Sequence, residues 1–265
     1  MDFEKKKDFH KKVDELERTN IDKRRIRKTD RSKQRSAVES VFDERTTFEL
    51  RKLLQNGPLN EIEGIISAGK EANVYLGYDL DGNEVAIKIY KIDRNTSKWM
   101  KNYILGDPRF KKVPKNISKV IYLWGRKEFK NLKRSYKYNL PVPKPIKIKS
   151  NILIMEYIGF GPIPAPQLKD IRKIRNPYDL LDRVLSFIKD LFQKAKLVHS
   201  DLSEFNILYH NQKPVIIDIS QAVSIAHPKA ERYLVRDIKN IFNYFEGIGI
   251  DMPNPEEFYY EVIDI

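Results

Sequence analysis

The chain of 265 residues contains no cysteine. This absence excludes disulfides, thiolate catalysis and cysteine-ligated zinc. No stretch approaches the eighteen or so apolar residues of a membrane-spanning helix. Residues 1–7 are mostly charged, unlike the apolar core of a secretory signal peptide. The four histidines are scattered, and no two have the spacing of metal ligands. We therefore expect a cytoplasmic protein with no membrane partner.

The most informative segment that is present is H-x-D-x-x-x-x-N at residues 199–206, with Asp218 following at the end of an apolar run. A phosphoryl-transfer site needs this set of groups. An acid such as Asp201 meets the acceptor hydroxyl, while an amide and a carboxylate, here Asn206 and Asp218, hold metal ions against a triphosphate. Taken alone, the motif also fits a loop whose polar residues only cap a turn. The upstream sequence has to distinguish the two interpretations.

Upstream, residues 66–75 fit the glycine-loop pattern G-x-G-x-x-G-x-V that covers nucleotide phosphates in kinases. The small-residue places and the final valine are taken by Ser67, Gly69, Ala72 and Val74. Small residues let backbone N–H groups approach phosphate oxygens, and Lys70 lies within the same loop. Strand-like runs at 62–66 and 73–77 flank it. The pattern therefore predicts a hairpin over a nucleotide.

A third predicted strand, residues 84–90, carries Lys88 within the sequence V-A-I-K. Its neighbours are apolar and should be buried on the opposite side, so Lys88 should face the loop. A buried ammonium needs an anionic partner. Glu128 is the candidate, because it lies on the apolar stripe of a predicted helix over 124–138. An exposed strand lysine and a solvated glutamate remain the alternatives.

These elements occur in the order of a protein kinase, and their details point further. The segments S-A-G-K-E-A-N-V-Y, H-S-D-L-S-E-F-N and I-D-I-S-Q closely resemble the RIO family of atypical serine/threonine protein kinases, most of all its type-1 branch. The resemblance covers roughly residues 40–265. It implies an α+β, bilobal protein-kinase-like fold with a small β-rich lobe, a reduced helical lobe and an N-terminal helical extension.

The resemblance also implies roles for individual residues, with ATP and Mg²⁺ or Mn²⁺ as cofactors. Asp201 matches the catalytic aspartate, and Lys88 the lysine that contacts the phosphates. Asn206 and Asp218 match the metal ligands, and in this family the aspartate at the position of Asp218 is also a site of phosphoaspartate formation. A carboxylate can attack phosphorus, so the two roles stay open. The hinge would lie at residues 155–158, where the backbone of Glu156 and Ile158 would meet adenine.

The chain departs from ordinary protein kinases after Asp218. Ser220 stands where D-F-G has glycine, and there is no A-P-E motif. Only 265 − 218 = 47 residues follow Asp218. We therefore expect no peptide-binding activation segment, and a kinase or ATPase with a restricted substrate, either itself or one partner.

The positive charge is concentrated. The chain carries +13 overall, and residues 93–149 alone contribute 17 basic minus 3 acidic side chains, or +14. Such clustering favours a polyanion partner, with RNA the obvious candidate. The family resemblance implies the small ribosomal subunit precursor and its rRNA. The alternative is a solvated, salt-bridged surface.

Further patterns divide the chain into an N-terminal extension and two lobes. The expected ranges are 1–58 for the charged helical extension, 59–158 for the small lobe and 159–265 for the large lobe. Thr46 and Glu49 read as a capping box for a helix that ends at Gly57. Residues 106–118 read as a mobile loop. Asp237 could brace the catalytic loop or lie on the surface.

Three hypotheses follow for the function. The first is an ATP-dependent atypical kinase or ATPase that phosphorylates itself and acts in small-subunit maturation. The second is a small-molecule phosphotransferase of the aminoglycoside type, which carries the same H-x-D-x-x-x-x-N motif. The third is a non-catalytic ribosome-assembly factor in which nucleotide acts only as a conformational ligand.

Overall fold

The computed structural model describes residues 42–110 and 112–264. The chain divides into two compact units, residues 1–48 and residues 49–265. The helices predicted before residue 42 lie outside the described residues. Helix α3 (Glu44–Asn56) crosses the boundary between the units and ends before Gly57, as predicted.

The start of α3 corrects one prediction. The carboxylate of Asp43 accepts hydrogen bonds from the Thr46 N–H at 3.1 Å and from the Thr46 hydroxyl at 2.6 Å. Asp43 therefore satisfies the first turn of the helix, and Thr46 lies inside that turn. The prediction of a capping box at Thr46 and Glu49 was wrong, because the helix already begins at Glu44 and Thr46 is therefore not the residue that precedes it.

The second unit begins with a five-stranded antiparallel sheet of order β1-β2-β3-β5-β4. Its strands are β1 (Leu59–Ala68), β2 (Ala72–Asp79), β3 (Glu84–Tyr90), β4 (Pro145–Lys149) and β5 (Ile152–Glu156). The predicted hairpins are present. The β2–β3 turn closes with Asp79 accepting from the N–H groups of Asp81 and Asn83. Gly82 has φ of 83° there, a conformation that favours glycine.

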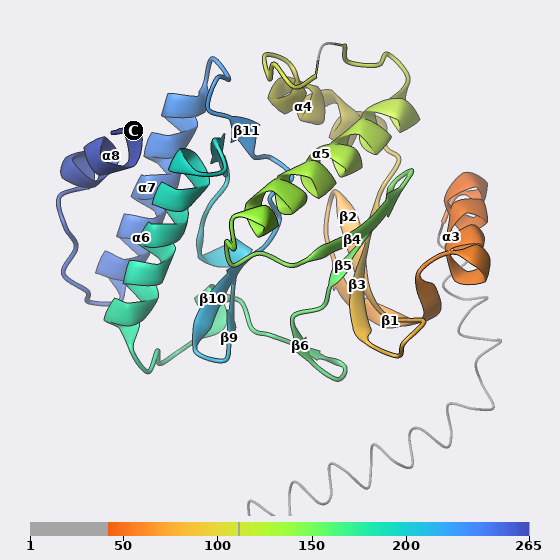
Figure 1. Cartoon of the computed structure of the whole chain (residues 1–265), viewed down its shortest axis with the longest axis horizontal. Helices are drawn as coiled ribbons and strands as arrows, with labels where there is room; N and C mark the ends of the chain where they lie inside the picture. Colours follow the sequence, from red (N-terminus) through yellow and green to blue (C-terminus); the bar gives the residue numbers. More distant parts are fainter. Residues whose placement is uncertain (1–41, 111, 265) are drawn as a thin grey trace, which may run out of the picture. The chain divides into compact units, whose positions relative to one another are not determined.

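Helix α5 (Ile117–Lys137) packs against this sheet and begins seven residues before its predicted start (Figure 1). The packing is close at Gly125, where a Cβ atom would lie 3.2 Å from a ring carbon of Tyr90. Trp124, fully buried on the same helix, contacts Trp99 edge-to-face with ring centroids 5.2 Å apart. The sheet face and α5 thus form one apolar layer.

Trp99 belongs to helix α4 (Arg94–Ile104), which the sequence analysis did not anticipate. Asp93 caps it by accepting from the N–H groups of Asn95 and Thr96. The signal was present in the sequence, because Met100 and Ile104 are four residues apart and both are fully buried. The stripe is short, and basic residues lie between its apolar positions, so the local sequence does not favour a helix strongly.

The rest of the second unit is mainly helical. Helices α6 (Pro177–Gln193), α7 (Ala230–Gly247) and α8 (Pro255–Ile263) lie together (Figure 1). Asn176 caps α6 by accepting from the Asp179 N–H. Three short strand pairs complete it: β6 (Gly159–Phe160) with β7 (Ile163–Pro164), β8 (Leu197–Val198) with β11 (Val223–Ser224), and β9 (Ile207–His210) with β10 (Lys213–Ile216).

One apolar core runs from the sheet and α5 through α6 and α7. The architecture is α+β, as predicted. Among the described residues, no helix combines the length and the apolarity required to cross a membrane.

Candidate active site

A cleft of about 530 Å³ lies in the second unit, between the sheet and the helical part. Nine of the predicted site residues line it: Ser67, Gly69, Lys70, Val74, Lys88, Glu156, Ile158, Asn206 and Asp218. Apolar side chains that the sequence analysis did not assign, including Met155, Leu208 and Ile217, complete its walls. Glu128 and Asp201 are not in the lining, but each contacts a residue that is: Glu128 accepts from Lys88, and the Asp201 carbonyl accepts from Asn206.

Lys88 is the central cation of the cleft. Its Nζ donates to Glu128 Oε1 at 3.0 Å and to Asp218 Oδ1 at 2.8 Å. Burial alone would lower the pKa of Lys88, but the two carboxylates hold this pKa above its ordinary value. Burial raises the pKa of Glu128 to about 7, against the opposing effect of Lys88. The predicted Lys88–Glu128 ion pair is present, and the alternatives of an exposed lysine and a solvated glutamate are wrong.

Asp218 follows β10 and adopts φ of 55°, a left-handed conformation that is uncommon outside glycine. Its Oδ1 also accepts from the Ser220 hydroxyl at 2.8 Å. Burial would raise the pKa of Asp218, but Lys88 and Ser220 hold it below the ordinary value. The side chain remains 39% exposed and lines the cleft. An ionised carboxylate is thus held, in a strained backbone, where a ligand can reach it.

The catalytic loop brings Asp201 and Asn206 together. The Nδ2 of Asn206 donates to the Asp201 carbonyl at 2.8 Å. Because this bond uses the amide nitrogen, the amide oxygen of Asn206 is left to act as a ligand. Asp201 Oδ2 accepts from Gln221 Nε2 at 2.7 Å. Burial and the charge of Asp218 raise the pKa of Asp201. A carboxylate with a raised pKa and an amide oxygen that is free to bind a cation therefore belong to one short loop.

Side chains of helix α7 hold the backbone of this loop through hydrogen bonds. Asp237 accepts from the Ser200 N–H at 2.7 Å and from the Leu202 N–H at 3.0 Å. The neighbouring side chains Arg236 and Asn240 donate to the carbonyls of Ser200 and Leu202. Asp237 is only 2% exposed. Of the two alternatives that the sequence left open, a brace of the catalytic loop and a surface position, the first is therefore correct. Burial raises the pKa of Asp237 to about 7, against these hydrogen bonds.

His199 also has a structural position. Its Nε2 lies 3.3 Å from the Ile217 carbonyl, and burial lowers its pKa to about 4. A buried neutral imidazole at the start of the H-x-D-x-x-x-x-N segment thus lies against the backbone just before Asp218. Within the described part of the chain, no cluster of three or more histidines and carboxylates suits a metal cage.

The donor set nevertheless fits magnesium. Asn206 offers an amide oxygen and Asp218 a carboxylate, both hard oxygen ligands in a cleft with room for phosphates and water. Mg²⁺ is commonly held by one or two protein oxygens together with substrate phosphates. A site with two protein ligands is therefore sufficient for this ion without a cage.

At the hinge, the backbone groups are already partly used. The N–H of Glu156 donates to the Lys144 carbonyl at 2.8 Å, and the carbonyl of Ile158 accepts from the Ala165 N–H at 2.9 Å. Any adenine contact at these two residues would therefore use the Glu156 carbonyl and the Ile158 N–H. This polarity, an acceptor followed by a donor, matches an adenine edge.

Two further polar residues of the site belong to the sequence motifs, although the motifs predict no role for them. Glu71 lines the cleft, and burial together with the charge of Asp218 raises its pKa to about 7. Gln221 contacts Asp201 from the segment after Asp218. Their positions within the two motifs were the available signal. Their contacts depend on which loops the fold brings together.

Comparison with known proteins places the chain among relatives of one kind. The RIO domain family matches residues 73–258. A RIO-type serine/threonine-protein kinase Rio1 from Haloferax volcanii is 40% identical over 213 residues, which cover 80% of this chain and 73% of that protein. The human serine/threonine-protein kinase RIO1 is 38% identical over 87% of this chain. This chain spans only 41% of the human protein and 53% of the one from Saccharomyces cerevisiae.

Solved structures agree on the fold. The Rio2 kinase from Chaetomium thermophilum, in a structure described as an ADP/Mg²⁺-phosphoaspartate complex, superposes with a TM-score of 0.62 at 24% identity. The match covers 82% of this chain and 66% of that one. The predicted protein-kinase-like fold is therefore confirmed.

Proposed function

The chain belongs to the RIO family of serine/threonine-protein kinases, and on this premise we propose that it transfers the γ-phosphoryl group of ATP. The observation that carries the proposal is the ion-pair network around Lys88. Its Nζ lies 2.9 Å from Glu128 Oε2 and 2.8 Å from Asp218 Oδ1. Lys88, Asp218 and Asn206 all line the same cleft. A lysine tied to a helix glutamate beside a metal-binding aspartate is the arrangement that kinases use on phosphates.

Each residue has a separate task in this proposal. The Glu156 carbonyl and the Ile158 N–H bind adenine, and the backbone around Gly69 covers the phosphates. Lys88 binds phosphate oxygens, and Asp201, whose pKa is raised, orients or accepts the proton of the acceptor. Asn206 and Asp218 would hold Mg²⁺ or Mn²⁺, which neutralises phosphate charge when bound.

The acceptor is a serine or threonine, Asp218 itself, or water. The Asp218 carboxylate supports the second route, because it is ionised and exposed to the cleft, and a carboxylate can displace ADP from phosphorus. The related Rio2 kinase from Chaetomium thermophilum forms a complex with ADP and Mg²⁺ that contains a phosphoaspartate. Transfer to the chain itself would give autophosphorylation, and transfer to water would give ATPase activity.

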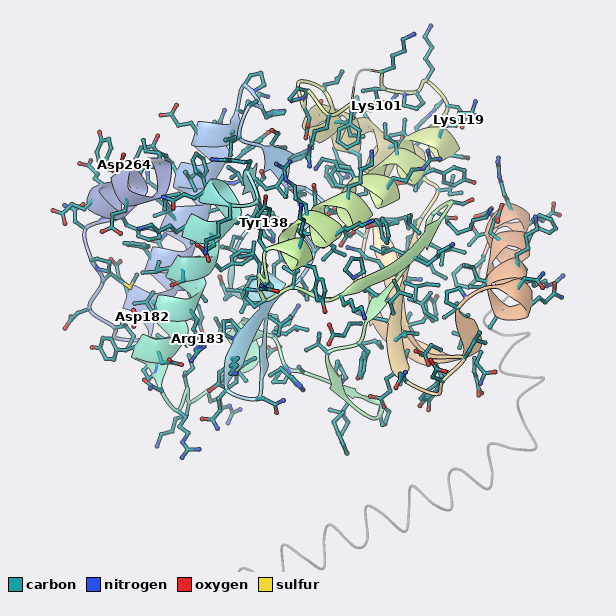
Figure 2. All side chains as sticks on the ribbon, viewed as in Figure 1. Lys101, Lys119, Tyr138, Asp182, Arg183 and Asp264 are labelled. Atoms are coloured by element: carbon teal, nitrogen blue, oxygen red, sulfur yellow. The ribbon has the colours of Figure 1, made fainter. Side chains whose placement is uncertain are left out.

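The test is to follow the γ-phosphate. With γ-labelled ATP and Mg²⁺, label should appear on the protein or as free phosphate. Label that survives acid treatment would be phosphoserine or phosphothreonine, whereas an acyl phosphate on Asp218 would be labile. Asp201→Ala should abolish labelling of serine and threonine. The matched control is Asp182→Ala, which removes an exposed aspartate of α6 (Figure 2). Equal labelling by Asp201→Ala and wild type would contradict the proposal.

A basic surface supports the proposed partner, the precursor of the small ribosomal subunit and its rRNA. On α5 the exposed face is a basic stripe that we define as Lys119, Arg126, Lys130, Lys133 and Lys137. Figure 2 marks Lys119 near the start of this helix and Lys101 on α4. A stripe of this spacing suits phosphate contacts rather than base reading. A cytoplasmic location accompanies this role.

The other two hypotheses are separated by their products. The small-molecule phosphotransferase would turn over hydroxylated amines without labelling itself, and membership of the RIO family argues against it. For a non-catalytic assembly factor, Asp201→Ala would still mature small subunits fully in cells depleted of the wild-type protein. Failure of that variant to support maturation would favour the kinase.

A further inference from the structure

The segment after Asp218 is held by side chains that the proposed reaction does not use. The Ala222 carbonyl accepts from Lys127 Nζ at 2.6 Å, from Asn131 Nδ2 at 3.0 Å and from Arg109 Nη2 at 3.3 Å. We call Lys127, Asn131 and Arg109 the carbonyl clamp. Three donors from outside the segment thus meet at one backbone oxygen.

The carbonyl clamp reaches further along the same segment. Lys127 Nζ also donates to the Ser220 carbonyl at 2.7 Å, and Asn131 Nδ2 donates to the Ile219 carbonyl at 2.9 Å. Both side chains are fully buried. Carbonyl oxygens at three of the four positions after Asp218 are therefore fixed by helix α5 and its preceding loop. The same helix carries Glu128, which binds Lys88.

Asp107 holds the third member of the carbonyl clamp in place. Its carboxylate accepts from Arg109 Nε at 2.9 Å and from Arg109 Nη2 at 2.6 Å, and Arg109 Nη1 donates to Asn131 Oδ1 at 2.7 Å. Asp107 is 1% exposed and also lies 3.4 Å from the Ser224 N–H. The start of the loop predicted to be mobile is thus bound to the segment after Asp218. Burial raises and Arg109 lowers the pKa of Asp107, and the net effect is a lowered pKa.

The held segment carries two groups of the site. Asp218, at its beginning, has the left-handed φ of 55°, which persists only where surrounding contacts fix it. Gln221, within it, donates to Asp201 Oδ2. On the far side, β11 pairs with β8, which leads directly into the catalytic loop. A shift of residues 219–222 would therefore move both the metal-binding and the proton-accepting carboxylates.

We propose that the carbonyl clamp positions Asp218 and Gln221 for phosphoryl transfer. Its donors come from α5 and from the loop before it, so the support of the segment after Asp218 lies outside that segment. This inference rests on the proposed function for its consequence, but the physical contact can be tested without nucleotide or metal.

The first experiment measures backbone amide exchange in the metal-free, nucleotide-free protein. In Lys127→Met, amides of residues 219–226 should exchange at least about tenfold faster than in wild type, since the Ser220 carbonyl loses its Lys127 donor and the Ala222 carbonyl loses one of its three donors. The β9–β10 hairpin, 207–216, should keep its protection, which shows that the lobe is folded. The matched control is Lys98→Met, which removes an exposed lysine of α4.

A second variant covers the case in which Lys127→Met fails to fold. Arg109→Lys keeps the charge on a side chain that is 20% exposed, but it cannot bind Asp107, Asn131 and the Ala222 carbonyl together. It should accelerate exchange of the same segment. Wild-type exchange at 219–226 in the folded Arg109→Lys variant would overturn the inference.

The second experiment separates positioning from general loss of stability. Affinity for ADP without metal should change less than about twofold in Arg109→Lys, because the hinge and Lys88 are intact. The additional affinity that Mg²⁺ confers should fall about tenfold, because the segment that follows Asp218 loses part of its support at the Ala222 carbonyl. An equal loss with and without Mg²⁺ would overturn the inference. Absence of any Mg²⁺ effect in wild type would instead contradict the proposed function.

Discussion

The ammonium of Lys88 lies 2.8 Å from Oδ1 of Asp218, a residue 130 positions later in the chain. The same ammonium binds Glu128 on α5. One buried cation therefore joins a strand of the sheet, a helix and the loop that carries Asp218. The arrangement fixes the distance between the residue that would bind phosphate and the residue that would bind metal before either ligand arrives.

Removing the cation should be costly because it leaves a buried carboxylate without a partner. We expect Lys88→Met to lower the free energy of unfolding by about 3–5 kcal/mol. Lys88→Met combined with Glu128→Leu should lose less than the sum of the two single variants, since the double variant leaves no unpaired charge on α5. Urea denaturation of the four proteins measures this coupling. Additivity within about 0.5 kcal/mol would contradict it.

Replacing Asp237 should slow transfer without weakening nucleotide binding. Asp237→Asn retains one acceptor for the two N–H groups of Ser200 and Leu202, so the catalytic loop loses part of its support. A displacement of this kind costs about 10²-fold in rate. Single-turnover transfer and ADP affinity should be measured together, with the exposed Asp251→Asn as the control. An equal loss of affinity and rate would show that Asp237 acts on the cleft as a whole.

The pH dependence of nucleotide binding should report on the ionisation of Glu71. Burial and the charge of Asp218 raise the pKa of Glu71 to about 7. Glu128 and Asp201 add to this effect, and Lys88 opposes it. Below pH 7 Glu71 is mostly neutral. As pH rises through 7 it ionises, and its charge then repels the phosphates. Metal-free ADP affinity should therefore fall between about pH 6 and pH 8 more steeply in wild type than in Glu71→Gln.

The variant comparison in this experiment cancels the ionisation of the nucleotide itself, which is common to both proteins. Identical pH profiles for wild type and Glu71→Gln would show that another group controls the dependence.

Polyanion binding should depend on the basic stripe of α5. Replacing Arg126 and Lys133 by alanine should weaken binding to single-stranded RNA and reduce the slope of log affinity against log salt by about 1.4. Filter binding at several salt concentrations measures the slope. The control replaces Lys173, which is exposed in the loop before α6, and Lys239, which is exposed on α7. An equal change in the control would indicate a response to net charge rather than to this surface.

The sequence by itself determined the order of the functional segments and most of the elements that carry them. Local patterns suffice for this, because a strand such as β3 or a helix start such as Asn176–Pro177 is specified by adjacent residues. The pairing of Lys88 with Glu128 was also predictable. A lone acid on the apolar stripe of a basic helix has few cationic partners that are themselves buried.

Only the tertiary structure decided which polar residues support the site. Lys127 and Asn131 lie on α5, yet they bind carbonyls 88 to 95 residues away. A buried lysine bonded to backbone oxygens has no signature in the sequence, since every residue supplies a carbonyl. The choice for Asp237 between brace and surface was open for the same reason. Side-chain contacts with distant backbone depend on how the elements pack, and that packing is a property of the whole core rather than of any local pattern.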